Sequence, residues 1–436
     1  MWPIALKVLI ALAGMFIGAF MLCSARLRVL PERSFLGCAL AAQAGLSLAL
    51  FVALYVIGGQ EVTSDVPGYY LPAAHAVLAG QIPFRDFTLS YAPLFPYISA
   101  ALVRLWDSGK VFALFAIIVN ALALPLWHRT AVRSVGDQVA RDSSVLYATS
   151  GHMIVQTLLG TNQVWVAAAL AASSLLLVRG ASTSSGLVQA LSVCTTKLLA
   201  PLFWPVLWIF APQRGRWLAA AFLAAAAIYG SFALLGADAF DALRRESEAI
   251  SPGNLPFIIG PLLGKQGELG GLRSDLLALT ALGLSTAWIY LRARGLAPAS
   301  RSQALLAAIA LTGLIFMLVS KKSFTGYMVF CMYPALLTVN LRLTGLAPRI
   351  AFVLVFNVLL VAEPSLWFHL GGNGLPLSRW LHAPGSGIAP VIFLLVDLAL
   401  LGCYGWLAVL SAQCVQQAQP HPRSPATLPQ PAQTAR

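Results

Sequence analysis

Long apolar runs separated by short polar connectors make up most of this chain. A helix that crosses a bilayer needs about 20 mainly apolar residues. We therefore expect an all-α, polytopic membrane protein with eleven transmembrane helices. The predicted spans are 2–23, 35–57, 111–127, 144–159, 164–178, 217–235, 275–291, 302–319, 327–341, 349–362 and 389–411.

A further apolar stretch, 187–210, is interrupted by Lys197, Pro201 and Pro205. Proline removes a backbone donor and breaks the helical ladder. Interrupted backbone at membrane depth is tolerated where protein covers it. This stretch predicts a pair of half-helices that returns to the same side of the membrane.

The composition agrees with a membrane protein, since 59% of the residues are hydrophobic, only 10% are charged and the mean hydropathy is +0.80. A soluble domain has about 25% charged residues. The net charge of +13 is therefore interpreted as a signal of topology, and no nucleic-acid partner is predicted. The six cysteines have neither the spacing of a metal site nor that of a disulfide framework.

Counting charges in the connectors predicts which side of the membrane each one faces. Connectors on one side carry 16 Lys and Arg against three acids, whereas those on the other carry 10 Lys and Arg against 11 acids. Because Lys and Arg collect in short cytoplasmic loops, the second side is expected to face the periplasm or exterior of a cytoplasmic membrane. A single domain, 1–411, would then present outer loops at 61–108, 236–274 and 363–388, followed by a disordered cytoplasmic tail, 412–436.

The most polar stretch lies in the first outer loop, between Glu61 and Tyr97. Asp65 precedes a predicted interfacial helix over 69–79, at the boundary between water and lipid. A carboxylate there can act as a general base toward an acceptor hydroxyl. Alternatively, Asp65 can cap the helix, and spacing alone slightly favours this capping role.

Other polar residues of this loop also have two interpretations each. Asp86 is a second catalytic acid, a metal ligand, or the partner of Arg85 in an ion pair. His75 either contacts substrate or makes a hydrogen bond within the scaffold. Tyr91 stands where the chain returns to the membrane, in the interfacial aromatic belt.

Three lysines outside this loop are also candidates. Lys321 and Lys322 lie between two predicted spans on the outer side, where they either bind a lipid phosphate or extend along the interface. Lys197 is an intramembrane charge, which is a functional hypothesis by default, although a structural partner is equally plausible. Asp397 lies in the last span, and we expect a buried hydrogen bond for it.

The run Asp65-x3-Tyr69-x4-Ala74-x3-Leu78-x-Gly80-x2-Pro83-x2-Asp86-Phe87-x3-Tyr91-x-Pro93-Leu94 resembles the first outer loop of the GT-C superfamily. Its members are polytopic glycosyltransferases that use polyprenyl-phosphate sugars. Within it, the chain looks closest to glycosyltransferase family 87 and to the polyprenol-phosphate-mannose-dependent mannosyltransferases. Three further stretches are similar to motifs of that family: Gly160-Thr161-Asn162-Gln163 with the span after it, 195–217, and 321–337. The resemblance covers roughly residues 60 to 340.

The resemblance implies an outward-facing cavity and an inverting transfer of a single sugar, with mannose favoured, to a lipid or cell-envelope acceptor. It makes Asp65 the general base and Asp86 the second choice. The implied donor-phosphate ligands are Lys321, Lys322 and Arg85, and the implied substrate contacts are Tyr69, His75, Tyr91, Asn162 and Gln163. Because an Asp-x-Asp pair is absent, no metal ligand is predicted and a divalent cation is left open as a cofactor.

Two other classes of function fit parts of the sequence. A transporter or lipid flippase would need ionisable residues near the membrane midplane, whereas most carboxylates lie in predicted outer loops. An envelope polymerase or ligase would need grouped outer arginines, for which Arg244, Arg245 and Arg273 are candidates.

Overall fold

The computed structural model describes residues 4–197, 199–238, 250–262, 272–370, 377, 380 and 387–418. Within these residues the fold is all-α, as predicted, and the single extended pairing is an isolated bridge between Pro83 and Phe87. Arg244 and Arg245, and most of the tail predicted to be disordered, lie outside the described residues.

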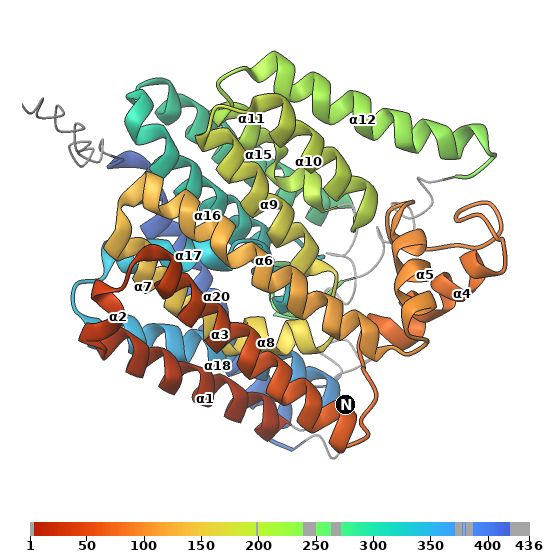
Figure 1. The fold of residues 1–436 in the computed structure, drawn as a ribbon, viewed down its shortest axis with the longest axis horizontal. Helices are drawn as coiled ribbons and strands as arrows, with labels where there is room; N and C mark the ends of the chain where they lie inside the picture. Colours follow the sequence, from red (N-terminus) through yellow and green to blue (C-terminus); the bar gives the residue numbers. More distant parts are fainter. Residues whose placement is uncertain are drawn as a thin grey trace, which may run out of the picture.

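The α-helices follow one another along the chain as drawn in Figure 1. They are α1 Ile4–Cys23, α2 Ala25–Val29, α3 Glu32–Phe51, α4 Leu71–Leu78, α5 Phe95–Leu105, α6 Lys110–Val135, α7 Asp137–Ala148, α8 Gly151–Leu158, α9 Gln163–Val178, α10 Ser182–Thr195, α11 Trp204–Phe210, α12 Arg214–Leu234, α14 Leu255–Leu262, α15 Leu272–Arg294, α16 Arg301–Val319, α17 Met332–Arg342, α18 Leu346–His369 and α20 Ala389–Gln416.

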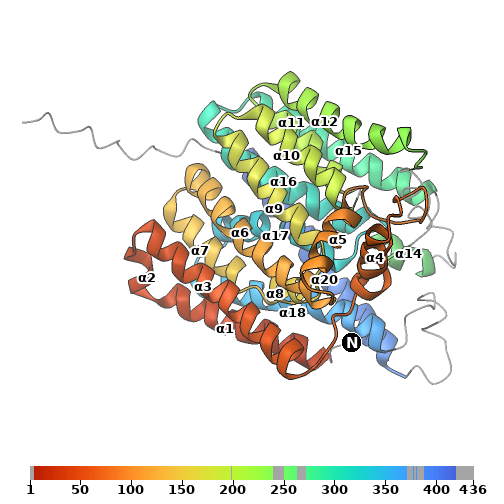
Figure 2. The ribbon, with the colours of Figure 1, turned by 45° about the vertical axis from the view of Figure 1, so that its right-hand side comes forward.

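The helices form a layered bundle. α10, α11, α12 and α15 gather on one side and α1 and α3 on the other, while α6, α9, α16 and α17 lie between them (Figures 1 and 2). Most of α16 is buried, whereas α12 and α15 expose most of their apolar surface. Leucines such as Leu223 and Leu279, 70% and 67% exposed, fit a surface that faces lipid rather than water.

Eight helices in the described part of the chain are long and apolar enough to cross a membrane: Ile4–Cys23, Glu32–Ile57, Lys110–Val135, Arg214–Leu234, Arg273–Arg294, Arg301–Val319, Leu346–His369 and Ala389–Gln416. The polytopic class is confirmed, and in the described part of the chain shorter apolar helices stand where some of the eleven spans were predicted. The predicted span 144–159 is instead two short helices, α7 and α8, because the chain breaks at Thr149 and Ser150. There the Ser150 side chain accepts the backbone N–H of Met153 and caps α8.

Two more predicted spans are shorter than a bilayer. α9 has 16 residues, and the predicted span 327–341 divides into a 3₁₀ turn, Thr325–Phe330, and the 11-residue α17. The stretch 187–210 is interrupted as predicted, since α10 ends at Thr195 and a 3₁₀ turn, Ala200–Phe203, precedes α11. Apolar composition marked these segments as buried, but their lengths depend on turns within them.

The first outer loop folds against the interruption that follows α10. A π-helical turn, Val66–Tyr70, leads into α4, and α5 returns the chain to the bundle. The backbone N–H groups of Ala92 and Leu94 donate to the carbonyl oxygens of Thr196 and Cys194, at 2.8 and 2.9 Å. These bonds fix the loop that carries Asp65 to the stretch that carries Lys197.

The ends of α18 and α20 differ from the predicted boundaries. α18 continues through His369, so Glu363 lies inside a helix and is fully buried rather than in an outer loop. α20 continues through Gln416, five residues into the predicted tail. In both cases the residues beyond the predicted helix end are apolar or helix-forming. Packing against the bundle stabilises these additional helical turns.

Charged residues lie at both ends of the bundle. Lys7 of α1 and Pro364 of α18 lie at the end that carries Asp65, where they line the same cavity. At the opposite end, Arg141 pairs with Asp137 at 2.6 Å and Arg349 pairs with Asp142 at 3.4 Å.

Close contact between α1 and α8 depends on glycine. A Cβ added to Gly151 would lie 2.2 Å from the Cα of Ala11, and one added to Gly14 would lie 2.3 Å from the carbonyl oxygen of Thr149. Both neighbours are backbone atoms, which cannot move aside as the end of a side chain can. The backbones therefore touch directly at the point where α7 and α8 are separated.

We expect Gly151→Ala to lower the stability of the protein by about 1–3 kcal/mol, the usual cost of overpacking a close-packed site. The measurement is thermal unfolding of the purified protein in detergent, followed by tryptophan fluorescence. Gly37→Ala in α3 is the matched control, because nothing lies within 4 Å of a Cβ at that position. Equal unfolding midpoints for the two variants would contradict this packing.

Candidate active site

A cavity of about 510 Å³ opens at the Asp65 end of the bundle. It lies between the first outer loop, α8, the interruption after α10 and the end of α18. Its polar and charged lining residues are Lys7, Thr63, Ser64, Asp65, Tyr69, Ser90, Tyr91, Gln156, Thr161, Gln163, Lys197, Ser251 and Tyr327, and its apolar wall includes Val155, Leu159, Phe324, Leu360, Val361, Pro364 and Phe368.

Asp65 enters this cavity from a strained segment of backbone. Ser64, the residue before it, has a positive φ of 74°, a conformation that non-glycine residues rarely adopt and that is often found at functional sites. Asp65 precedes the π-helical turn, but its side chain caps no backbone N–H there. The capping interpretation of Asp65 is therefore wrong.

The Asp65 carboxylate instead contacts two side chains from distant parts of the chain. Its Oδ2 atom accepts a hydrogen bond from the Tyr91 hydroxyl and pairs with the Lys197 ammonium at 3.2 Å. The other oxygen, Oδ1, accepts no hydrogen bond from the residues that the structure describes. Asp65 thus has one oxygen held in place and one available toward the cavity.

Lys197 comes from the interruption between α10 and α11. The sequence offered it as an intramembrane charge but did not assign it to the site around Asp65. Its ammonium also lies 4.9 Å from the ring centre of Tyr91 and 5.9 Å from that of Tyr327, as in cation–π contacts. Only 20% of its side chain is exposed. A lysine within an interrupted apolar helix indicated that Lys197 has a special role. The sequence did not indicate that its partner is Asp65, 132 positions away.

Aromatic side chains hold Tyr91 in position. Its ring stacks on Phe95 at 4.6 Å and meets Tyr70 edge-on at 5.2 Å. Burial, together with Tyr70 and the Asp65 carboxylate, raises the pKa of Tyr91 well above its usual value. The phenol therefore stays protonated and donates to Asp65 at any pH near neutrality.

Amides line the inner wall. Gln163 begins α9 and borders the cavity, and its buried Oε1 has no partner among the described residues. Asn162 lies just behind, 1% exposed, with its backbone N–H donated to the Tyr70 hydroxyl at 3.2 Å. An unpartnered amide at a cavity wall is free to bind a sugar hydroxyl.

Lys7 adds a second positive charge to the cavity. It projects from α1, is 6% exposed, and donates to Ser365 Oγ at 3.0 Å. Among the described residues, the charged lining is thus Lys7, Lys197 and Asp65, two ammonium groups against one carboxylate. This balance favours an anionic ligand.

Several predicted site residues of the first loop lie outside this lining. Arg85 and Asp86 pair with each other at 2.9 Å, and the Asp86 carboxylate also accepts the backbone N–H of Ile82 at 2.7 Å. These two bonds lower the pKa of Asp86 and fix the tip of the loop. His75 contacts Asp107 at 3.4 Å on the exposed surface. Of the predicted substrate contacts, Tyr69, Tyr91 and Gln163 line the cavity.

Lys321 is buried in an ion pair. Its ammonium lies 2.8 Å from Asp275, with only 1% of the side chain exposed. Neither Lys321 nor Lys322 lines the cavity, although Phe324 and Tyr327 of the same segment do. Their role as phosphate ligands stays a prediction.

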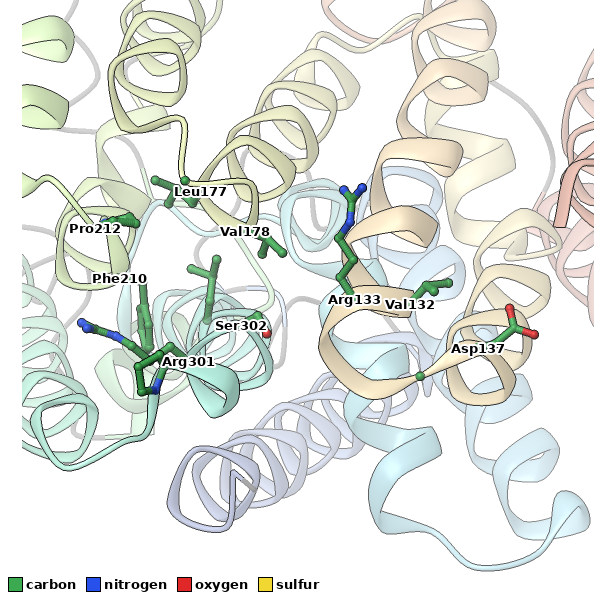
Figure 3. Close-up of a pocket in the computed structure, with 13 residues that line it drawn as sticks. Val132, Arg133, Asp137, Leu177, Val178, Phe210, Pro212, Arg301 and Ser302 are labelled. Carbon is green, nitrogen blue, oxygen red and sulfur yellow. The ribbon is translucent and has the colours of Figure 1, made fainter. Parts of the chain in front are cut away.

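A larger cavity of about 850 Å³ lies at the opposite end of the bundle (Figure 3). Arg133 and Asp137 stand on one side of it, and Leu177, Phe210 and Pro212 on the other. Asp137 is already paired with Arg141, and Arg301 donates to the carbonyl oxygen of Ile209 at 3.2 Å. Among the described lining residues of this larger cavity, Asp137 is the single carboxylate. The smaller cavity, which holds Asp65 beside two lysines, is the candidate active site.

The fold of this chain is similar to that of a solved protein structure. The crystal structure of ArnT from Cupriavidus metallidurans bound to undecaprenyl phosphate is similar over 86% of this chain and 76% of that one, with a TM-score of 0.49 and 14% sequence identity. No family model and no curated protein matches the chain. A likeness at this level carries no argument about function, which must rest on the residues of the cavity.

The contact between Asp65 and Lys197 is testable by a double-mutant cycle. Asp65→Asn and Lys197→Met should each destabilise the protein because each leaves a partly buried charge without its partner. The free energy of unfolding of the double variant should fall by less than the sum of the two single decreases, with a coupling energy of about 1 kcal/mol or more. Thermal unfolding of the four proteins measures it, and additive losses would show that the two groups do not interact.

Proposed function

We propose that this protein is a membrane glycosyltransferase that moves a single sugar from a polyprenyl-phosphate donor to a lipid or cell-envelope acceptor. The observation that carries the proposal is Asp65, held by Tyr91 and Lys197 in a cavity whose other charged group, among the described residues, is the ammonium of Lys7. A base beside cations is what the transfer of a sugar from a phosphate requires.

In the proposed reaction, Asp65 Oδ1 takes the proton of the acceptor hydroxyl. The acceptor oxygen then bonds to the anomeric carbon as the bond from that carbon to the phosphate oxygen breaks. The electron pair leaves with the phosphate, and the configuration inverts. Tyr91 holds Oδ2 and so orients the carboxylate for the incoming hydroxyl.

Lys197 and Lys7 are the cations proposed to bind the departing phosphate, since both line the cavity. Ammonium groups bind phosphate as point charges, and a developing negative charge is stabilised best where water is excluded. Arg85, Lys321 and Lys322 stay in the proposal as outer groups that could meet the donor before it enters. The apolar wall at Leu360, Val361 and Phe368 suits the first part of a polyprenyl chain.

The resemblance in sequence favours mannose as the sugar and the outer face of the cytoplasmic membrane as the location. Gln163 and Tyr69 are proposed to bind the sugar, because both border the cavity. The unpartnered amide oxygen of Gln163 would accept a hydrogen bond from a sugar hydroxyl.

The purified protein should transfer labelled sugar from a polyprenyl-phosphate donor to envelope lipid, and Asp65→Asn should lower the rate by about 10²–10⁴-fold, as expected for loss of a general base. Glu61→Gln is the matched control. Glu61 belongs to the same loop but is exposed and pairs with Lys110 at 3.3 Å. Full activity in Asp65→Asn would remove Asp65 from the mechanism.

Lys197→Gln should weaken donor binding, and this effect is separable from that of Asp65. We expect a KM for the donor raised about tenfold or more, because one charge-assisted phosphate contact contributes about 1.5–3 kcal/mol. Lys322→Gln is the comparison, since Lys322 lies outside the cavity lining. A larger rise in KM for Lys322→Gln would assign the phosphate to the outer lysines instead.

A transporter or lipid flippase is the second candidate, and one observation favours it. Glu363 and Asp397 are buried inside α18 and α20, and ionisable residues within membrane helices often mark transport pathways. Neither residue lines the 510 Å³ cavity. Movement of polyprenyl-phosphate sugar across a reconstituted vesicle, without transfer to any acceptor, would support this candidate over the enzyme.

A further inference from the structure

Two fully buried carboxylates lie side by side in the membrane-spanning part of the bundle. Glu363 of α18 and Asp397 of α20 are each 0% exposed and close enough to interact electrostatically. With a rise of 1.5 Å per residue, Glu363 is about 9 Å from the end of α18 and Asp397 about 12 Å from the start of α20. The two residues therefore lie at similar depths below one end of the bundle.

These carboxylates have no partner that neutralises them. In the described part of the chain, neither forms an ion pair. The Thr325 hydroxyl lies near Glu363 and the backbone N–H of Gly253 lies near Asp397, but neither contact has the geometry of a full hydrogen bond. Burying one such charge unpaired is already costly, and burying two beside each other is more so.

Two hydroxyl groups complete this cluster. Tyr404 is 0% exposed, interacts with both carboxylates, and its hydroxyl has no partner. It lies two helical turns beyond Asp397 on the same face of α20, and helical side chains tilt toward the N-terminus, here toward Asp397. Thr325, also 0% exposed, interacts with Glu363 through its hydroxyl, whose Oγ1 has no other partner in the described part of the chain.

Six oxygens of this cluster thus lack a well-aligned hydrogen bond in the described part of the chain: Glu363 Oε1 and Oε2, Asp397 Oδ1 and Oδ2, Tyr404 OH and Thr325 Oγ1. Carboxylate and hydroxyl oxygens are the ligands of hard cations, and six is a common coordination number for both Mg²⁺ and Ca²⁺. Two carboxylates supply the charge that balances a divalent ion.

Backbone packs closely over the cluster. Gly253 has a φ of 88°, and a Cβ there would lie 3.8 Å from Glu363 Oε2 and 3.6 Å from Thr325 Cγ2. The neighbouring Ser251 donates its N–H to the carbonyl oxygen of Lys321 at 2.8 Å, and Asn254 Nδ2 donates to that of Ser323 at 3.1 Å. The cluster therefore joins α18 and α20 to two turns at this end of the bundle.

We propose that Glu363, Asp397, Tyr404 and Thr325 form a binding site for a hard divalent cation, Ca²⁺ or Mg²⁺, that fastens these turns to α18 and α20. The ion would also stabilise the adjoining wall of the active-site cavity, since Ser251, Phe324 and Pro364 line that wall. Its role is structural, and it takes no part in the transfer of sugar.

The test uses the full-length protein in detergent, stripped with a chelator and desalted. Titration with CaCl₂ or MgCl₂ alone should raise the thermal unfolding midpoint in a saturable way, because an ion that binds only the folded state stabilises it by mass action. Elemental analysis after a second desalting should find one equivalent of the ion that gives the larger shift.

Glu363→Gln and Asp397→Asn should abolish both the shift and the retained ion. Tyr404→Phe removes a single neutral ligand and should only weaken the response, which keeps the proposal testable if a carboxylate variant fails to fold. Asp107→Asn, an exposed carboxylate at the surface, is the control that should respond as the unaltered protein does.

The proposal would be contradicted if neither Ca²⁺ nor Mg²⁺ raised the unfolding midpoint of the unaltered protein and the protein retained neither ion after desalting. The two carboxylates would then share a proton, and Glu363→Gln would unfold at the same temperature or higher. Because no measurement of sugar transfer enters this experiment, its outcome is independent of the proposed enzymatic function.

Discussion

Contact between Asp65 and Lys197 is the interaction on which the candidate site depends. It joins the first outer loop to the interruption between α10 and α11, and the backbone bonds from Ala92 and Leu94 reinforce that junction. A lysine amid apolar helices is costly unless an opposite charge is near. The pair therefore holds the outer loop against the interrupted stretch of the bundle.

The other ionisable residues differ in whether an opposite charge lies beside them, and this difference indicates their roles. Arg85 with Asp86, and Lys321 with Asp275, are satisfied pairs that fix loops. Asp65 keeps one oxygen available, which suits a base. Glu363 and Asp397 are compensated by no described residue, and a bound cation would supply what they lack. Pairing with an opposite charge thus distinguishes ionisable groups with a structural role from groups proposed to bind a ligand.

Local sequence predicted much of the bundle. Apolar runs identified the long helices because a single helix satisfies its own backbone, whatever surrounds it. Predictions failed where a break depends on neighbours. The turn at Thr149 and Ser150 is needed because α1 and α8 approach through Gly14 and Gly151, and no periodicity in 144–159 reveals that contact.

For the site, the sequence by itself determined that the polar loop around Asp65 is the candidate for the chemistry, because a cluster of charges beside membrane spans is costly without a use. Only the tertiary structure decided that Asp65 caps no helix and contacts Lys197 and Tyr91, and that Asp86 pairs with Arg85 at the loop tip. The physical reason is that an ion pair depends on distance in space. Residues 132 positions apart become partners only when the helices between them have packed.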